Sequence, residues 1–168
     1  MTYQQQQTCS GWANMMEKIT SFTIDHDVLV PGFYISRKDG DITTYDLRTR
    51  RPNRGDYMSN ADMHSVEHMF ATYIRNSEIA DSVIYFGPMG CQTGFYLLVR
   101  DIDPVQVFEV TKEVLRKIIA HEGEVFGASA AECGHYENLD LQTAKEECRF
   151  YLNVLEKQTN LEFTYPVK

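Results

Sequence analysis

Two histidines four residues apart stand with a glutamate between them in the stretch DMHSVEHMF, residues 62–70. On an α-helix His64 and His68 would lie on one face, one turn apart, so both imidazoles could reach a single metal ion. Glu67 would lie on the same general side, where a carboxylate can serve as an acid/base group beside the metal. The spacing therefore predicts a mononuclear metal site. The alternative is a helix surface that carries two ordinary histidines and a solvated charge.

A catalytic site of this kind uses three protein ligands and keeps one position open. Candidates for the third ligand are Cys91, Cys133, His121, His135 and distant carboxylates. Cys133 is the preferred one, because it lies in a glycine-flanked loop just before a helix, and a thiolate with two imidazoles suits Zn²⁺ or Fe²⁺. The alternative for Cys133 is a small buried hydrophobic residue. His135 ranks below Cys133, and we expect it at the surface.

Cys91 lies in the stretch GPMGCQTG, between Gly90 and Gly94. The glycines predict a tight turn between two apolar strands, and such turns often carry catalytic residues. The alternative is a cysteine that only packs in the turn. Cys148 lies on the apolar stripe of a predicted helix and is interpreted as buried, and Cys9 has no assigned role.

The elements that must position these residues follow from hydrophobic periodicity and turn signals. Helices are predicted from Asn60 or Asp62, either of which could be the cap, to about Asn76, from Pro104 with Asp103 as its cap, and from about Leu141. Strands are predicted at residues 21–24, 28–37, 41–48, 82–89 and 94–100. This order favours an α+β fold, a single-domain layer of mainly antiparallel sheet packed against helices. We expect residues 1–15, which are rich in glutamine, to be a disordered extension before a domain at 16–168.

Composition limits the possible partners and location. The chain has 168 residues and a formal net charge of −8, without a basic run, which argues against nucleic acid as a partner. No stretch approaches the roughly 18 apolar residues of a membrane span, so no membrane partner is expected. Four cysteines without an export signal indicate reduced thiols and a cytoplasmic location.

Five segments together resemble the S-ribosylhomocysteine lyase (LuxS) family, in order and at the expected separations. They are SFTIDH (21–26), YDLRTRRPN (45–53), MHSVEH (63–68), GPMGCQTGFYLLV (87–99) and ECGHYENLDL (132–141). The resemblance implies a cytoplasmic homodimer that cleaves S-ribosylhomocysteine to homocysteine and 4,5-dihydroxy-2,3-pentanedione, the precursor of autoinducer-2. That reaction belongs to the activated methyl cycle and to quorum sensing.

The resemblance also implies roles for individual residues. The metal ligands would be His64, His68 and Cys133, and the acid/base pair would be Glu67 and Cys91. Substrate contacts from the partner subunit, across composite active sites, would be Ser21, His26 and Arg48. The cofactor would be one Fe²⁺ per chain, replaceable by Zn²⁺ or Co²⁺. One departure is the segment YFGPMGC, in which Tyr85 and Gly87 stand where many members carry a sequence such as DISPMGC.

Two other functions fit the metal motif alone. An inverted-zincin metallopeptidase uses the same His-x-x-Glu-His helix, but such enzymes usually take a distal carboxylate as third ligand and are longer. A non-enzymatic, metal-stapled dimeric module would instead have a closed four-ligand site, with His135 as a candidate fourth ligand. The thiols of Cys91 and Cys133 favour the lyase.

Overall fold

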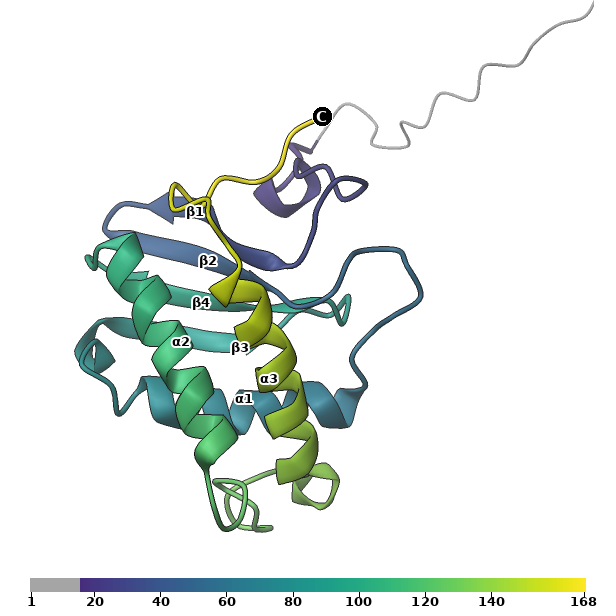
Figure 1. Cartoon of the computed structure of the whole chain (residues 1–168), viewed down its shortest axis with the longest axis vertical. Coiled ribbons are helices and arrows are strands. Elements are labelled where there is room, and N and C mark those ends of the chain that lie inside the picture. Colours follow the sequence, from purple (N-terminus) through teal and green to yellow (C-terminus); the bar gives the residue numbers. More distant parts are fainter. Residues whose placement is uncertain (1–15) are drawn as a thin grey trace, which may run out of the picture.

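The computed structural model describes residues 16–168, and the expectation for residues 1–15, including Cys9, lies outside this range. Its sheet has four antiparallel strands in the order β1-β2-β4-β3 (Figure 1). In chain order the elements are η1 (Thr20–Phe22), β1 (Gly32–Asp39), β2 (Ile42–Arg48), α1 (Asn60–Ile74), η2 (Ala80–Ser82), β3 (Val83–Pro88), β4 (Gly94–Arg100), α2 (Pro104–Ala120), η3 (Tyr136–Asn138) and α3 (Leu141–Glu156).

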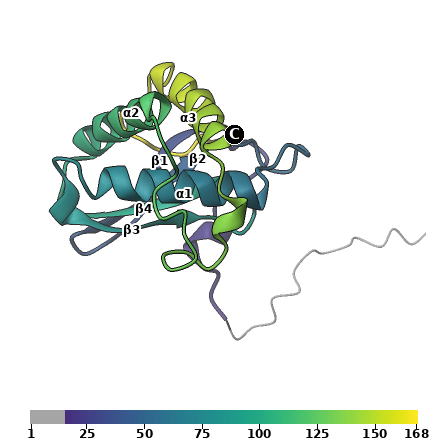
Figure 2. The same ribbon diagram turned by 90° about the horizontal axis from the view of Figure 1, so that it is seen from below.

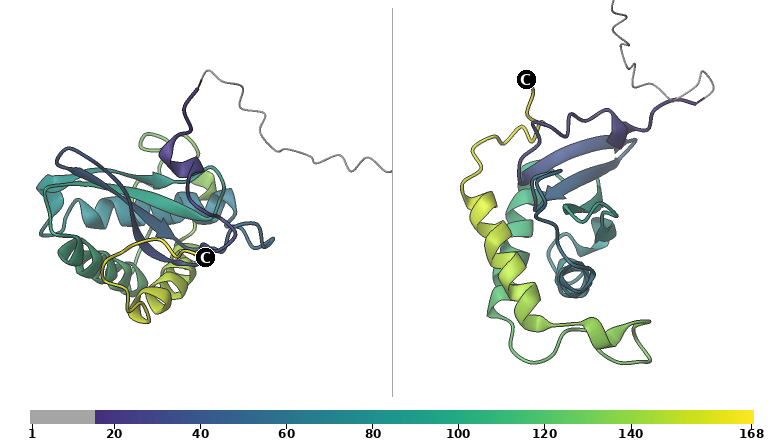
Figure 3. Two further views of the ribbon diagram at one scale, coloured as in Figure 1. Left: turned by 90° about the horizontal axis from the view of Figure 1, so that it is seen from above. Right: turned by 90° about the vertical axis from the view of Figure 1, so that its right-hand side faces the viewer.

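The helices α1, α2 and α3 all cover one face of the sheet, and the N-terminal segment with η1 lies on the opposite face (Figures 2 and 3). The predicted α+β layer fold is therefore confirmed. None of the helices between residues 16 and 168 has the length and hydropathy needed to cross a bilayer.

Strand β2 shows why both faces of the sheet are covered. Tyr45 and Leu47 point into the core beneath the helices and are 0% and 1% exposed. Side chains alternate along a strand, so Asp46 and Arg48 face the other way. They are nevertheless only 0% and 2% exposed. Tyr165 of the C-terminal segment bonds to Asp46 on this second face. Arg48, which the family resemblance assigns to substrate binding, is therefore buried in this chain.

Helix α1 begins one residue earlier than the predicted caps suggested. Ser59 is the N-cap: its hydroxyl accepts from the backbone N–H of Asp62, and the Asp62 carboxylate accepts from the backbone N–H of Ser59. This reciprocal pair is a capping box, so Asp62 serves as the third helical residue and not as the cap. The prediction for the second long helix is confirmed, because the carboxylate of Asp103 caps α2 and Pro104 follows at its first position.

Two strand predictions need correction at the N-terminal side. Residues 21–24 do not form a strand: the backbone N–H of Phe22 donates to Ile19 and the hydroxyl of Thr23 donates to the carbonyl of Thr20, which closes a 3₁₀ turn. The predicted strand at 28–37 begins only at Gly32 and extends to Asp39. Pro31, immediately before it, has no N–H to give to a ladder.

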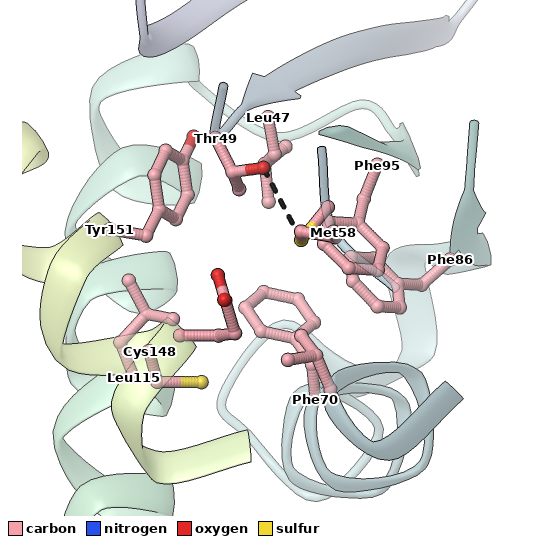
Figure 4. Close-up of a pocket in the computed structure, with 11 residues that line it drawn as sticks. Leu47, Thr49, Met58, Phe70, Phe86, Phe95, Leu115, Cys148 and Tyr151 are labelled. Atoms are coloured by element: carbon pink, nitrogen blue, oxygen red, sulfur yellow. Dashed lines mark hydrogen bonds between the residues drawn. The ribbon is translucent and has the colours of Figure 1, made fainter. Parts of the chain in front are cut away.

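A small cavity of about 10 Å³ lies between α1, α3 and the sheet (Figure 4). Its lining is apolar except at a few points, such as the hydroxyl of Thr49, which lies 3.5 Å from the sulfur of Met58. Cys148 borders this cavity and is 1% exposed, and burial raises the pKa of its thiol. The prediction of a buried Cys148 is therefore confirmed. A cavity of this size has room for no more than about one water molecule.

Candidate active site

The three predicted metal ligands converge. One ligand atom from each of His64, His68 and Cys133 lies within 4.8 Å of the others. Sγ of Cys133 is 3.3 Å from Nε2 of His64. Ligands at about 2.0–2.3 Å from a tetrahedral ion lie roughly 3.5 Å apart, so this spacing fits one shared ion.

Each imidazole is held by its second nitrogen. Nδ1 of His64 lies 2.5 Å from Oδ1 of Asn138, and Nδ1 of His68 lies 2.7 Å from the carbonyl oxygen of Phe126. Both partners are acceptors, so each Nδ1 carries the proton and each Nε2 keeps its lone pair. This is the tautomer that binds a metal through Nε2, and an acceptor behind the ring is the usual support of a ligating histidine.

The loop between α2 and α3 brings Cys133 to helix α1. The carbonyl of Ser129 accepts from the backbone N–H groups of Glu132 and Cys133, which forms a tight turn. Gly127 lies against the ring of His68: it has φ +70°, and a Cβ there would be 3.2 Å from Nδ1. A glycine at this position therefore allows both the turn and the close approach to the ligand.

The donor set fits a divalent transition metal. Two neutral imidazoles and one thiolate are borderline-soft ligands that suit Zn²⁺ or Fe²⁺ and leave a fourth position for substrate. The backbone N–H of His135 donates to Sγ of Cys133 at 3.4 Å, and its side chain is exposed, as the sequence predicted.

Glu67 lies on the same helix face, in a cleft of about 270 Å³ that His64, Pro88 and His135 also line. Glu67 therefore shares this cleft with His64, one of the three converging residues. A carboxylate at this place can exchange protons with a molecule bound in the cleft.

Cys91 is exposed and lies in the turn between β3 and β4, as predicted. Its Sγ is 3.0 Å from Oγ1 of Thr93. Main-chain hydrogen bonds hold this turn to the segment that follows β2. The carbonyl of Thr93 accepts from the backbone N–H groups of Thr49 and Arg50, and the carbonyl of Gln92 accepts from the backbone N–H of Met58. An accessible thiol on a firmly held turn is suited to act on a bound substrate.

Arg48 lies beside this thiol in a buried network. Its guanidinium makes two hydrogen bonds to Asp46, of 2.6 and 3.1 Å, and a third of 2.6 Å to Thr93. Tyr165 donates its hydroxyl to the same Asp46 carboxylate at 2.8 Å. Burial raises the pKa of the Asp46 carboxyl, although the neighbouring Arg48 acts in the opposite direction. Burial lowers the pKa of the Arg48 guanidinium, but the charges and hydrogen bonds around it, chiefly those of Asp46, raise that pKa overall. Arg48 is therefore a fixed cation.

The other two predicted substrate contacts lie on the N-terminal segment. Ser21 lines a hollow of about 420 Å³ on the outer face of the sheet, together with Tyr85 and Tyr96. Nδ1 of His26 donates to the carbonyl of Ile24 at 2.9 Å, which leaves Nε2 available. The cleft that Glu67 lines and the hollow that Ser21 lines are different surfaces of the chain.

Sequence reasoning missed the residues that support the site: Asn138, the carbonyl of Phe126, Asp46 and Thr93. Asn138 and Asp46 lie inside the segments ECGHYENLDL and YDLRTRRPN, beside residues that were selected. Their contacts are long-range or depend on strand orientation, so only their proximity in sequence could have drawn attention to them.

The fold and site together define an α+β protein with a candidate His–His–Cys metal site, formed by two histidines of helix α1 and a cysteine of the loop between α2 and α3. Residues 19–162 match the family described as S-Ribosylhomocysteinase (LuxS). The chain is 46% identical to the S-ribosylhomocysteine lyase of Finegoldia magna over 156 residues, which covers 90% of this chain and 99% of the relative. It is 44% identical to that of Clostridium beijerinckii, over 90% and 99% of the two chains, and 42% identical to that of Borreliella burgdorferi, over 88% and 99%. The chain belongs to the S-ribosylhomocysteine lyase (LuxS) family.

Proposed function

We propose that this protein is a metal-dependent carbon–sulfur lyase that cleaves S-ribosylhomocysteine to homocysteine and 4,5-dihydroxy-2,3-pentanedione. The observation that carries the proposal is the convergence of His64, His68 and Cys133 in a chain of this family. Family membership does not favour a metallopeptidase or a non-enzymatic metal-stapled module. The product is the precursor of autoinducer-2, so the protein would serve quorum sensing and the activated methyl cycle.

The reaction needs acid/base groups more than redox chemistry. The thioether sulfur is a poor leaving group until a carbonyl stands two carbons from the carbon that bears it. The sugar carbonyl must therefore migrate along the chain, and each move removes a proton from a carbon beside a carbonyl and returns it to the neighbouring carbon. The last step removes the newly acidic proton and expels homocysteine as a thiolate, which then takes up a proton.

The residues of the chain divide these tasks between them. A divalent ion, when bound, supplies a Lewis acid that stabilises negative charge on the sugar oxygens. Cys91 takes and returns the carbon protons, because its exposed thiol can become a nucleophilic base. Glu67 moves protons between the sugar oxygens and assists the elimination. Positioned acid/base groups of this kind contribute about 10²- to 10⁴-fold each.

The substrate-binding roles extend the proposal to a homodimer with composite sites. Ile19 and Tyr85 are 57% and 50% exposed on the sheet face opposite the helices, near the hollow that Ser21 lines. A second copy packed on this face would cover these side chains and bring Ser21, His26 and Arg48 to the metal centre of its partner. Sedimentation or light scattering should therefore give twice the monomer mass, and a monomer under assay conditions would contradict the composite site.

The metal proposed is Fe²⁺, one per chain, with Zn²⁺ or Co²⁺ as functional substitutes. All three fit two imidazoles and a thiolate, and none is required to change oxidation state. Cys91, Cys133 and Cys148 are free thiols, which supports a reducing, cytoplasmic location.

A direct assay tests the reaction. Anaerobically purified protein is incubated with S-ribosylhomocysteine, and the released thiol is titrated. Stoichiometric thiol release that requires metal supports the lyase, and no release from a fully metal-loaded protein would refute it.

A matched control addresses the closed four-ligand alternative. His135→Ala should keep its full metal content, because the hydrogen bond from His135 to Cys133 comes from its backbone N–H and its side chain is not one of the three converging ligands. Loss of metal from this variant would support a closed structural site.

A further inference from the structure

We propose that Asn138 is a positioning residue for the metal centre, which selects the ligating tautomer of His64 and locks the Cys133 loop to helix α1. The inference rests on the proposed metal site but not on the reaction. It starts from the 2.5 Å contact between Oδ1 of Asn138 and Nδ1 of His64. With its Nδ1 proton held there, the imidazole can present only the Nε2 lone pair, and Nε2 is the atom that faces Cys133.

The amide of Asn138 makes a second contact at its other end. Nδ2 of Asn138 donates to Oδ1 of Asn60 at 2.9 Å. Asn60 is the first residue of α1 and lies one helical turn before His64, so the amide of Asn138 spans that turn. A flipped amide would direct an N–H group at Nδ1 and would favour the tautomer with the proton on Nε2, which cannot bind metal. In the structure the Asn60 contact engages the nitrogen of the Asn138 amide, and the amide oxygen faces the histidine.

The surrounding loop is docked onto the same helix at a second point. The backbone N–H of Asp140 donates to the hydroxyl of Ser65 at 2.9 Å, and Ser65 is 0% exposed. Asn138 lies between this anchor and Cys133, at the end of the short helix η3. Its side chain therefore links the loop that supplies the thiolate to the helix that supplies both imidazoles.

The two histidines differ in how their support can be removed. His68 donates to the main-chain carbonyl of Phe126, which no side-chain substitution deletes. His64 depends on a side chain, so substitution of Asn138 changes the support of one ligand and leaves all three ligands in place. An acceptor behind a ligating histidine is typically worth about 10- to 100-fold in metal affinity.

Three variants test the proposal, with metal affinity as the readout. The dissociation constant for Zn²⁺ is measured by competition with a chromophoric chelator, and the absorption spectrum of the Co²⁺ form reports the geometry of the ligand set. Asn138→Leu should bind Zn²⁺ about 10- to 100-fold more weakly. Asn138→Asp keeps the acceptor and should bind within a few-fold of the wild type with an unchanged Co²⁺ spectrum. Asn60→Ala should lose less Zn²⁺ affinity than Asn138→Leu, because it removes a partner of the Asn138 amide but leaves that amide in place.

Thermal unfolding of the metal-free proteins separates positioning from a purely structural role. If Asn138 only stabilised the loop, Asn138→Leu and Asn138→Asp would weaken metal binding equally and would both lower the midpoint of the metal-free protein. That result, or wild-type affinity in Asn138→Leu, would overturn the proposal. If the wild-type protein itself bound no metal, the proposed function would fail instead, so the two failures are distinguishable.

Discussion

Nη1 of Arg48 lies 3.9 Å from Sγ of Cys91 within the same chain. The sequence analysis, following the family resemblance, assigned Arg48 to substrate across the dimer and Cys91 to acid/base chemistry. The structure joins the two, because the guanidinium that Asp46 and Thr93 hold in place also faces the thiol. If both residues take part in the reaction, as we propose, they serve the same active site.

The first prediction concerns the reactivity of Cys91. Nη1 of Arg48 is close enough to donate a weak hydrogen bond to the Cys91 sulfur, and a cation beside a cysteine increases its nucleophilic reactivity. Removing the guanidinium should therefore slow alkylation of Cys91 by iodoacetamide by about a few-fold, measured by mass spectrometry of the peptide that contains it.

Arg48→Met alone is not a suitable variant, because it leaves the Asp46 carboxylate buried without its cation. This would lower the free energy of unfolding by about 3–5 kcal/mol. The double variant Asp46→Asn/Arg48→Met removes both charges. Arg48→Lys is the control that keeps a cation, and it should react faster than the double variant. Equal rates in all three proteins would mean that the charge does not act on the thiol.

The second prediction separates the two accessible thiols by elemental analysis. Cys133→Ala should lose metal, since it removes one of three converging ligands. Cys91→Ala should retain about one ion per chain and lose turnover by about 10²-fold or more, because it removes a base and no ligand. If the two variants lose metal to the same extent, the proposed role of Cys91 is wrong.

The third prediction tests the composite site by subunit exchange. Glu67→Ala and Cys91→Ala are each expected to be nearly inactive, and random mixing puts about half of the dimers in mixed form. If Glu67 of one chain works with Cys91 and Arg48 of its partner, one of the two sites in each mixed dimer is intact. Thiol release should then recover to roughly a quarter of the wild-type rate.

Two further mixtures check that result. Glu67→Ala with Asp46→Asn/Arg48→Met should also recover, whereas Cys91→Ala with Asp46→Asn/Arg48→Met should not, because Cys91 and Arg48 lie together in one chain. Recovery of activity in the last mixture would mean that Cys91 and Arg48 of one chain act in different active sites. No recovery in any mixture, with exchange verified by mass, would place the whole site in one chain.

The fourth prediction contrasts two glycines near the turn. A Cβ at Gly94 would lie 2.5 Å from the carbonyl oxygen of Leu47 and 3.2 Å from Cα of Arg48, both backbone atoms that cannot move aside. Gly94→Ala should lower the free energy of unfolding by about 1–3 kcal/mol. The three atoms nearest to a Cβ at Gly87 all belong to the side chain of Tyr85, which is half exposed and can rotate. Gly87→Ala should therefore cost about 0.5 kcal/mol or less.

Chemical denaturation measures both glycine variants. A large cost for Gly87→Ala that Tyr85→Ala relieves would show that the Tyr85 ring is fixed in solution, as it would be if a second subunit covered it. The variants Gly87→Ala and Tyr85→Ala also test why Tyr85 and Gly87 occur together in the segment YFGPMGC. The Tyr85 ring occupies the space that a side chain at position 87 would need.

Local sequence determined the parts of the molecule that depend on short-range geometry. The four-residue spacing of His64 and His68 places both on one helix face whatever the rest of the chain does. Asp103 followed by Pro104 was sufficient to predict the start of α2, and the glycines around Cys91 predicted its turn. The strand at 21–24 was predicted wrongly, because hydrogen bonds within the segment close a turn and override its β-propensity.

Tertiary structure decided what surrounds these residues. Asn138 and Phe126 are 74 and 58 positions away from the histidines that they support, so no local pattern pairs them. Arg48 meets Cys91 because β2 and β4 pair in a register that sets Arg48 opposite Gly94, beside the turn. The sequence by itself therefore determined which residues could do chemistry, whereas the packing of a loop on a helix and the register of two strands decided which groups orient them, because such contacts depend on segments that meet only when the whole chain folds.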